Sequence, residues 1–223
     1  PPRDAGPSLR TPAVDYSLGL ARRLGWSGGG PPLSLAVTLA DRADADAVVG
    51  AFPDPLRPLA VLANSGAFGP AKLWTEEGMV ALARALAERG CNVVLIGGPD
   101  ELAATRRVAK SAGRREVLAA GAIRNVSLGL SKALVQRARL LVSTDSGPRH
   151  MGPAFGVPTV SLFGPTDPAW TDLKTPLDRW VRLALECQPC QARNCPLGHH
   201  RCMRELGLAP VLAAAEAQLA GAG

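Results

Sequence analysis

The stretch STDSGPRHMGPAFGVPTVSLFGPTDP, residues 143–168, decides how this chain is expected to fold. It contains the end of one apolar run, a Gly-Pro turn that can open a helix, and a second apolar run that begins at residue 158. A strand, a helix and a strand in this order form a βαβ unit with parallel strands. Side chains that directly follow the first strand then lie at the carboxyl edge of the sheet, where open α/β folds bind ligands.

The same alternation extends outward from this stretch to residue 59. Short apolar runs predict strands, and amphipathic segments between them predict helices. The helix over 74–90 has Thr75 as its expected N-cap and Gly90 as its stop. Strands are expected at 59–65, 92–98, 140–147 and 158–165, the last of them closing the sheet, and helices at 74–90, 100–113 and 127–138. The pattern predicts an α/β fold, a Rossmann-like parallel sheet with helices on both faces.

The first fifty residues are less regular. Apolar spacing predicts a short helix over 14–24, the run LSLAVTLA predicts a strand over 33–40, and a second helix is expected over 41–50. The Pro-rich start carries no periodicity and suits a linker. We therefore expect residues 1–50 to be a crossover from a preceding domain, and residues 51–223 to form the compact domain.

The composition favours an anionic partner. The net charge is +6 and the pI is about 9.5, but the arginines are scattered rather than gathered into a basic tract. Nucleic acid is one possible partner, and a phosphorylated small molecule or an anionic glycolipid explains this charge as well. The sequence has neither the roughly 18-residue apolar run of a spanning helix nor the start of a signal peptide, so we expect a soluble cytoplasmic chain.

The strand that ends near residue 144 delivers the first candidate ligand site. Asp145, Ser146 and Gly147 follow it, Pro148 suits a first helical turn, and His150 projects from that turn. Exposed backbone amides and the helix dipole would favour a phosphate there. The alternative is an ordinary strand-to-helix turn in which Asp145 or Ser146 only caps the helix.

The second candidate is the loop NSGAFGPAKLW, residues 64–74, which follows another strand. Ser65 and Gly66 allow a ligand to come close to the backbone, and Lys72 offers a mobile point charge for a diphosphate. The alternative is a solvated lysine in a surface loop. Because both loops are expected at the same edge of one sheet, we interpret them as two halves of one phosphate site.

A cysteine-rich segment follows the last predicted strand. Its spacing is Cys187-x2-Cys190-x4-Cys195-x6-Cys202, with two histidines between the last two cysteines. Four thiols within sixteen residues of a cytoplasmic chain suggest a structural zinc site. Reduced thiols or disulfides are the alternatives.

Four motifs together resemble glycosyltransferase family 9, the lipopolysaccharide heptosyltransferases. They are GAFGPAKLW, VVLIGGPDE, STDSGPRH and LFGPTDP, and FGPAK is most similar to heptosyltransferase II. The resemblance covers about residues 14–215, and the order of the motifs is more specific than any one of them. It implies the carboxy-terminal half of a GT-B fold, which holds ADP-heptose across a cleft from an amino-terminal acceptor domain.

The resemblance also implies roles for single residues. Lys72 would contact the donor phosphates and stabilise the leaving group. The donor pocket would further contain Ser65, Gly66, Asp145, Ser146, Gly147 and His150. Heptose would move with inversion to the lipid A–Kdo/heptosyl core at the cytoplasmic face of the inner membrane of a Gram-negative bacterium, with no required cofactor and no nucleic acid. The catalytic base would be a carboxylate of the amino-terminal domain.

The chain departs from the family at two positions of the loop 64–74, with Asn64-Ser65 where Pro-Gly is frequent and Leu73 where Arg is frequent. Two other functions are kept as alternatives. One is a non-catalytic zinc-knuckle interaction module on an α/β scaffold. The other is a related nucleotide-sugar enzyme, such as an epimerase or a transferase that uses UDP-sugars.

Overall fold

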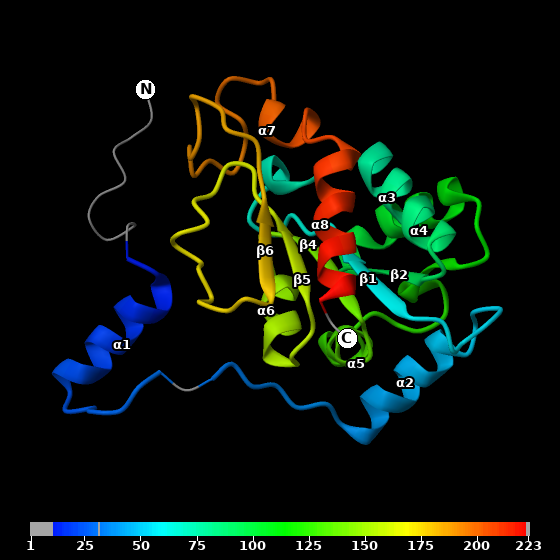
Figure 1. Cartoon of the computed structure of the whole chain (residues 1–223), viewed down its shortest axis with the longest axis horizontal. Coiled ribbons are helices and arrows are strands. Elements are labelled where there is room, and N and C mark those ends of the chain that lie inside the picture. The colour runs from blue at the N-terminus through cyan, green and yellow to red at the C-terminus, as the bar shows by residue number, and fades with distance from the viewer. Residues whose placement is uncertain (1–10, 31, 222–223) are drawn as a thin grey trace.

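A computed structural model describes residues 11–30 and 32–221 of the chain (Figure 1). The described residues form one six-stranded sheet in which every pair of neighbouring strands is parallel. The strands are β1 Leu59–Ala63, β2 Asn92–Ile96, β3 Val117–Ala119, β4 Leu140–Thr144, β5 Thr159–Leu162 and β6 Asp178–Val181. Their order is β3-β2-β1-β4-β5-β6, so the direction of winding reverses between β1 and β4. The predicted Rossmann-like sheet is confirmed.

Helices cover both faces of the sheet, as predicted. The longer ones are α1 Ala13–Arg23, α2 Leu39–Val49, α3 Glu76–Glu88, α4 Leu102–Ala112, α5 Leu128–Gln136, α6 Gly147–Ala154 and α8 Leu208–Ala220. The short ones are α7 Arg201–Arg204 and the 3-10 turns η2 Pro70–Lys72, η3 Pro99–Glu101 and η4 Ala120–Ala122. One apolar core joins α3, α4 and α8 to one face, and a second joins α2, α5 and α6 to the other.

Burial on both faces explains the sequence of the central strands. Every residue of β1 and β2 is buried, so both strands are apolar without alternation, apart from Asn92 at the start of β2. The helix that connects them begins at the predicted N-cap, because the Thr75 side chain accepts a hydrogen bond from the Gly78 N–H. It is followed by Gly90, whose φ of +85° suits glycine.

The predicted strand over 33–40 is wrong. Residues 32–38 have no regular structure, and α2 begins at Leu39. Thr38 and Asp41 form a capping box, in which the Thr38 side chain accepts from the Asp41 N–H at 3.1 Å and the Asp41 carboxylate accepts from the Thr38 N–H at 3.1 Å. Ala45 and Val48 of α2 are fully buried. The packed domain therefore includes α2 and begins before the expected boundary at residue 51.

The sheet does not close with β5, because β6 adds an edge strand beside it. The sequence of β6 is DRWV, in which Arg179 and Trp180 are exposed. Such a polar edge strand lacks the apolar signature of the central strands. The three-residue strand β3 and the helices α7 and α8 were not predicted either.

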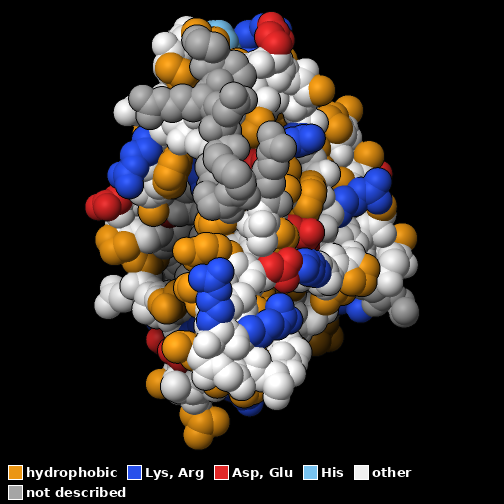
Figure 2. Space-filling view, turned by 90° about the vertical axis from the view of Figure 1, so that its left-hand side faces the viewer, with side chains coloured by type: hydrophobic (Ala, Val, Ile, Leu, Met, Phe, Trp, Pro, Cys, Tyr) orange, Lys and Arg blue, Asp and Glu red, His pale blue; other side chains and the backbone are white. Residues whose placement is uncertain are grey.

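Helix α1 confirms the helix expected over 14–24, but it stands apart from the sheet (Figure 1). None of its described side chains is buried, and Val14, Tyr16 and Leu20 are about half exposed. Figure 2, which views this side, shows hydrophobic, Lys and Arg side chains together on the surface. Among the described residues, no helix combines the length and apolar character needed to span a membrane.

The contact between α6 and β5 gives a test of the fold. A Cβ atom at Gly152 would lie 2.0 Å from the Thr159 hydroxyl and 3.2 Å from the Val157 carbonyl oxygen. We expect Gly152→Ala to lower the free energy of unfolding by about 1–3 kcal/mol through overpacking, measured by urea denaturation. Gly19→Ala is the control, because nothing lies within 4 Å of a Cβ there. Equal stability of the two variants would contradict this packing.

Candidate functional site

The loops that follow β1 and β4 meet at the point where the winding of the sheet reverses. The Ser65 N–H donates to the Thr144 hydroxyl at 3.2 Å, and that hydroxyl donates to the Ser65 carbonyl oxygen at 2.9 Å. In open α/β sheets the crevice at such a switch point is the usual ligand site. The expectation that both loops lie at one edge of the sheet is confirmed.

Lys72 and Asp145 are in direct contact across this edge. The Lys72 ammonium donates to the Asp145 backbone carbonyl at 2.7 Å and to its carboxylate at 2.8 Å, and it also lies 4.7 Å from the centre of the Phe68 ring. The Lys72 side chain is 12% exposed and that of Asp145 is 5% exposed. Because Lys72 is bonded to Asp145 and nearly buried, it is neither the mobile point charge that we expected nor the solvated lysine of the alternative.

Asp145 is surrounded by donors. One of its carboxylate oxygens also accepts from the Thr166 hydroxyl at 2.7 Å, and the other accepts from the Thr171 hydroxyl and the Arg149 guanidinium at 3.2 Å each. Burial acts to raise the pKa of Asp145. The hydrogen bonds from Lys72 and Thr166 and the nearby positive charges outweigh it, so the pKa lies below its ordinary value. The carboxylate is ionised at neutral pH.

Helix α6 places the other predicted residues beside this pair. Ser146 is the residue before the helix, but its hydroxyl donates to the Thr144 carbonyl at 3.2 Å, and no described side chain caps α6. The alternative in which Asp145 or Ser146 caps the helix is therefore wrong. His150 follows in the first turn and is half-buried. Burial and the Arg149 charge lower the pKa of His150, so its imidazole is neutral at pH 7.

A cavity of about 420 Å³ opens next to Ser65 and Gly147. Its wall comes from the carboxyl ends of β1, β2 and β4 and from the start of α5. Pockets for small molecules and cofactors have volumes of this order. The other residues that line it are Ala67, Ile96, Gly97, Gly98, Pro99, Asp100, Glu101, Val126, Ser127, Leu128, Ser131, Pro148 and Met151.

Glu101 lines this cavity and was not predicted as a site residue. Its carboxylate accepts from the Gly66 N–H at 3.0 Å and from the Gly98 N–H at 2.8 Å, and so it connects the loops after β1 and β2. The signal was present in the motif VVLIGGPDE, which places an acidic residue just after the second strand. In dinucleotide-binding folds, an acidic residue at the sheet edge binds ribose hydroxyls.

Asn64 explains how the loop 64–74 keeps its shape. Its side-chain amide donates to the Trp74 carbonyl at 3.0 Å and accepts from the Trp74 N–H at 2.9 Å, which closes the loop at its base. Trp74 is buried and its indole donates to the Leu206 carbonyl at 2.8 Å. The departure from the family at Asn64 thus has a structural role.

The cysteine-rich segment forms one cluster. Cys187, Cys190, Cys195 and Cys202 line a void of about 20 Å³ together with His199 and His200. All four thiols are free, and burial raises the pKa of Cys202 to about 11. Within residues 11–30 and 32–221, no three metal-ligating side chains are placed so that they could hold an ion. The zinc site therefore stays a prediction.

This segment packs directly on the loop that carries Lys72. The Arg193 carbonyl accepts from the Ala71 N–H at 3.0 Å, and a Cβ at Gly69 would lie 2.4 Å from the same carbonyl oxygen. The Arg193 guanidinium also lies 5.3 Å from the centre of the Phe68 ring. The cysteine-rich segment is thus part of the wall that supports Lys72.

Several known proteins are similar to this chain in sequence and in fold. A lipopolysaccharide heptosyltransferase 1 from Pseudomonas aeruginosa is 36% identical over 148 residues, which are 64% of this chain and 39% of that protein. The structure of E. coli ADP-heptose lps heptosyltransferase II matches with a TM-score of 0.71 and 21% identity, over 88% of this chain and 56% of that one. A glycosyl transferase family 9 structure from Veillonella parvula matches with a TM-score of 0.75 and 22% identity, over 95% of this chain and 61% of that one. The chain thus spans less than two thirds of each of these relatives.

A family model matches most of the sequence. The model described as Glycosyltransferase family 9 (heptosyltransferase) matches residues 8–201, which include both sheet-edge loops and most of the cysteine-rich segment. The chain therefore belongs to glycosyltransferase family 9, the heptosyltransferases.

Proposed function

We propose that this chain is the donor-binding half of an inverting heptosyltransferase, which moves heptose from ADP-heptose to the inner core of lipopolysaccharide. The observation that carries the proposal is the Lys72 ammonium, held by Asp145 at the switch point of the sheet, where Ser65 and Gly147 of the same two loops line a cavity of about 420 Å³. This arrangement offers a positive group for phosphates and a pocket for the nucleoside. A solved relative, E. coli heptosyltransferase WaaC, is described with ADP-2-deoxy-2-fluoro heptose and matches with a TM-score of 0.53 and 21% identity.

The parts of the donor can be assigned by their chemistry. The nucleoside would occupy the cavity, and Glu101 would accept hydrogen bonds from the ribose hydroxyls, because a carboxylate has lone pairs beyond those used by its two backbone donors. The diphosphate would lie over Gly147, where a helix begins. Ser65 and Gly66 would flank it, and Ser146 and His150 would lie beside the sugar.

Departure of ADP is the step that this half of the enzyme would assist. Negative charge develops on the diphosphate as the glycosidic bond breaks, and a preorganised cation stabilises that charge. Lys72 has three N–H groups, of which Asp145 takes two in the described chain, so the third is available to the leaving group. Asp145 is a poor base because its carboxylate already accepts from two cations. The base that activates the acceptor hydroxyl would come from the companion half of the fold.

The acceptor and the location follow from this proposal. The acceptor would be the anionic lipid A–Kdo/heptosyl core at the cytoplasmic face of the inner membrane, and the net charge of +6 suits such a surface. No cofactor would be required for the transfer. An interaction module without activity finds no support in the family match, which covers both sheet-edge loops as well as three of the four cysteines of the cysteine-rich segment.

Removal of the Lys72 charge tests the proposal. We expect calorimetry to detect ADP binding that is tighter than UDP binding, and Lys72→Ala to raise the Kd for ADP about tenfold or more, because a charge-assisted hydrogen bond is lost. Lys174→Ala is the control, since Lys174 is an exposed lysine that pairs with Asp15 outside the site. Circular dichroism would verify folding. Absence of ADP binding, or equal affinity of the Lys72 and Lys174 variants, would contradict the donor site.

The support of the Lys72 loop by the cysteine-rich segment has a separate test. Gly69→Ala would place a methyl group against the Arg193 carbonyl and push the segment away from the loop. We expect the half-buried thiols of Cys187, Cys190 and Cys195 to react several times faster with a thiol reagent in this variant. Gly29→Ala, where nothing lies within 4 Å of a Cβ, should react like the unchanged protein.

We further propose that the four thiols bind structural zinc, as their spacing suggests. Protein purified without chelator should then contain about one zinc per chain by elemental analysis. The double variant Cys187→Ser with Cys190→Ser should lose it, whereas Cys91→Ser should retain it, because Cys91 is buried against the other end of the sheet. Metal-free protein with four titratable thiols in the cluster would show that the segment is held by packing alone.

A further inference from the structure

Behind Lys72, a row of buried charges leads from the donor edge to the last strand of the sheet. Lys72 contacts Asp145, Asp145 contacts Arg149 at 3.2 Å, and the Arg149 guanidinium donates twice to one Asp178 oxygen, at 2.6 and 3.0 Å. The side chain of Arg149 is 0% exposed and that of Asp178 is 2% exposed. The row consists of two cations and two anions in alternation.

Alternation is what allows these four charges to be buried. An isolated buried charge costs several kcal/mol, and removal of one partner leaves the next charge uncompensated. Arg149 also lies 4.7 Å from the centre of the Phe163 ring, so its guanidinium is held by a cation–π contact as well as by two carboxylates. The position of each charge in the row therefore depends on its neighbours.

Asp178 is the fixed end of this row. The Ser161 hydroxyl donates to one carboxylate oxygen, and the Trp180 indole donates to the other at 3.1 Å. The two residues that follow Asp178 in β6 are exposed, whereas its own carboxylate points into the sheet edge toward Arg149. Asp178 thus belongs to a strand far from the donor loops in sequence, yet only two contacts separate its carboxylate from Asp145.

We propose that Asp178 is a positioning residue for the donor phosphates. Together with Arg149 it fixes the orientation of the Asp145 carboxylate, and this carboxylate in turn aims the Lys72 ammonium at the diphosphate. The inference rests on the proposed donor site and extends it to a residue outside the ligand pocket. Without Asp178, Arg149 has a single carboxylate partner left, Asp145, and competes with Lys72 for it.

The variant Asp178→Asn distinguishes a positioning role from a long-range electrostatic effect and from a role in the fold alone. The change keeps the shape and removes one negative charge. If the effect were only long-range electrostatics, ADP would bind more tightly, because the region becomes more positive. If Asp178 only maintained the fold, ADP and adenosine would lose affinity together. A positioning role predicts that the Kd for ADP rises about tenfold while the Kd for adenosine changes less than twofold.

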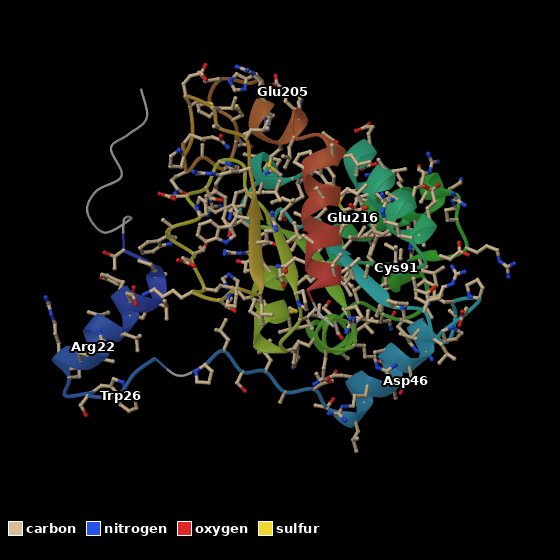
Figure 3. All side chains as sticks on the ribbon, in the orientation of Figure 1. Arg22, Trp26, Asp46, Cys91, Glu205 and Glu216 are labelled. Atoms are coloured by element: carbon tan, nitrogen blue, oxygen red, sulfur yellow. The ribbon has the colours of Figure 1, made fainter. Side chains whose placement is uncertain are left out.

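The measurement uses the full chain, with calorimetry for ADP and ligand-observed NMR for the weaker adenosine. Ser161→Ala is a milder second variant, because it removes one hydrogen bond to Asp178 and one from Arg149 Nε but keeps all four charges, and we expect a smaller shift in the same direction. It keeps the proposal testable if Asp178→Asn fails to fold. Asp46→Asn is the matched control, since Asp46 forms an Asp–Arg pair on the exposed side of α2, with Arg137 (Figure 3).

The outcomes are distinct. Selective loss of ADP affinity in the Asp178 or Ser161 variant, with none in the Asp46 variant, supports the inference. Unchanged or tighter ADP binding overturns it, and so does a parallel loss of ADP and adenosine. If the unchanged protein binds no ADP, the proposed function itself fails. If it binds ADP in a Lys72-dependent way and Asp178→Asn has no effect, only the positioning role fails.

Discussion

The contact between Lys72 and Asp145 is the constraint on which the rest of the site depends. The two residues lie 73 positions apart in the sequence, and each is nearly buried. Burial of either charge without the other would cost several kcal/mol, so the folded state requires that the loops after β1 and β4 lie next to each other. The hydrogen bonds between Ser65 and Thr144 and the closed loop at Asn64 bring about this approach with backbone geometry. The surface that we propose for phosphates is therefore held in place by contacts within the protein itself.

The sheet leaves few other places for chemistry. Helices cover both of its faces, and the central strands are mostly apolar, with Asn92 at the start of β2 and Ser143 and Thr144 at the end of β4 as buried polar residues. Polar side chains can therefore gather only at an edge, and the carboxyl edge is where the cavity, Glu101 and the amino end of α6 lie together. The chain covers 56% and 61% of the two solved relatives described above.

Sequence reasoning recovered the parts of this molecule that rest on local pattern. Apolar runs located four of the strands, and the glycine-containing loops after two of them were correctly expected to meet at one edge of the sheet. It failed where the decisive contact is distant in sequence. The edge strand β6 has a polar sequence and is defined by its pairing with β5. The Lys72 ammonium was expected to be mobile because a sequence does not show that Asp145 lies 2.8 Å away. The periodicity of the run LSLAVTLA does not distinguish a strand from a helix. The capping box at Thr38 starts helix α2 inside this run.

The junction between the cysteine-rich segment and the Lys72 loop is made by main-chain atoms, with the Arg193 carbonyl facing the Ala71 amide and the bare α-carbon of Gly69. A junction of this kind depends on the path of the backbone more than on the side chains along it. Substitutions are therefore expected to be tolerated differently on the two sides of the junction. Around Arg193, side chains other than the cysteines and the Arg193 guanidinium, which lies against Phe68, can change as long as the carbonyl stays in place, whereas any side chain at position 69 would meet that carbonyl.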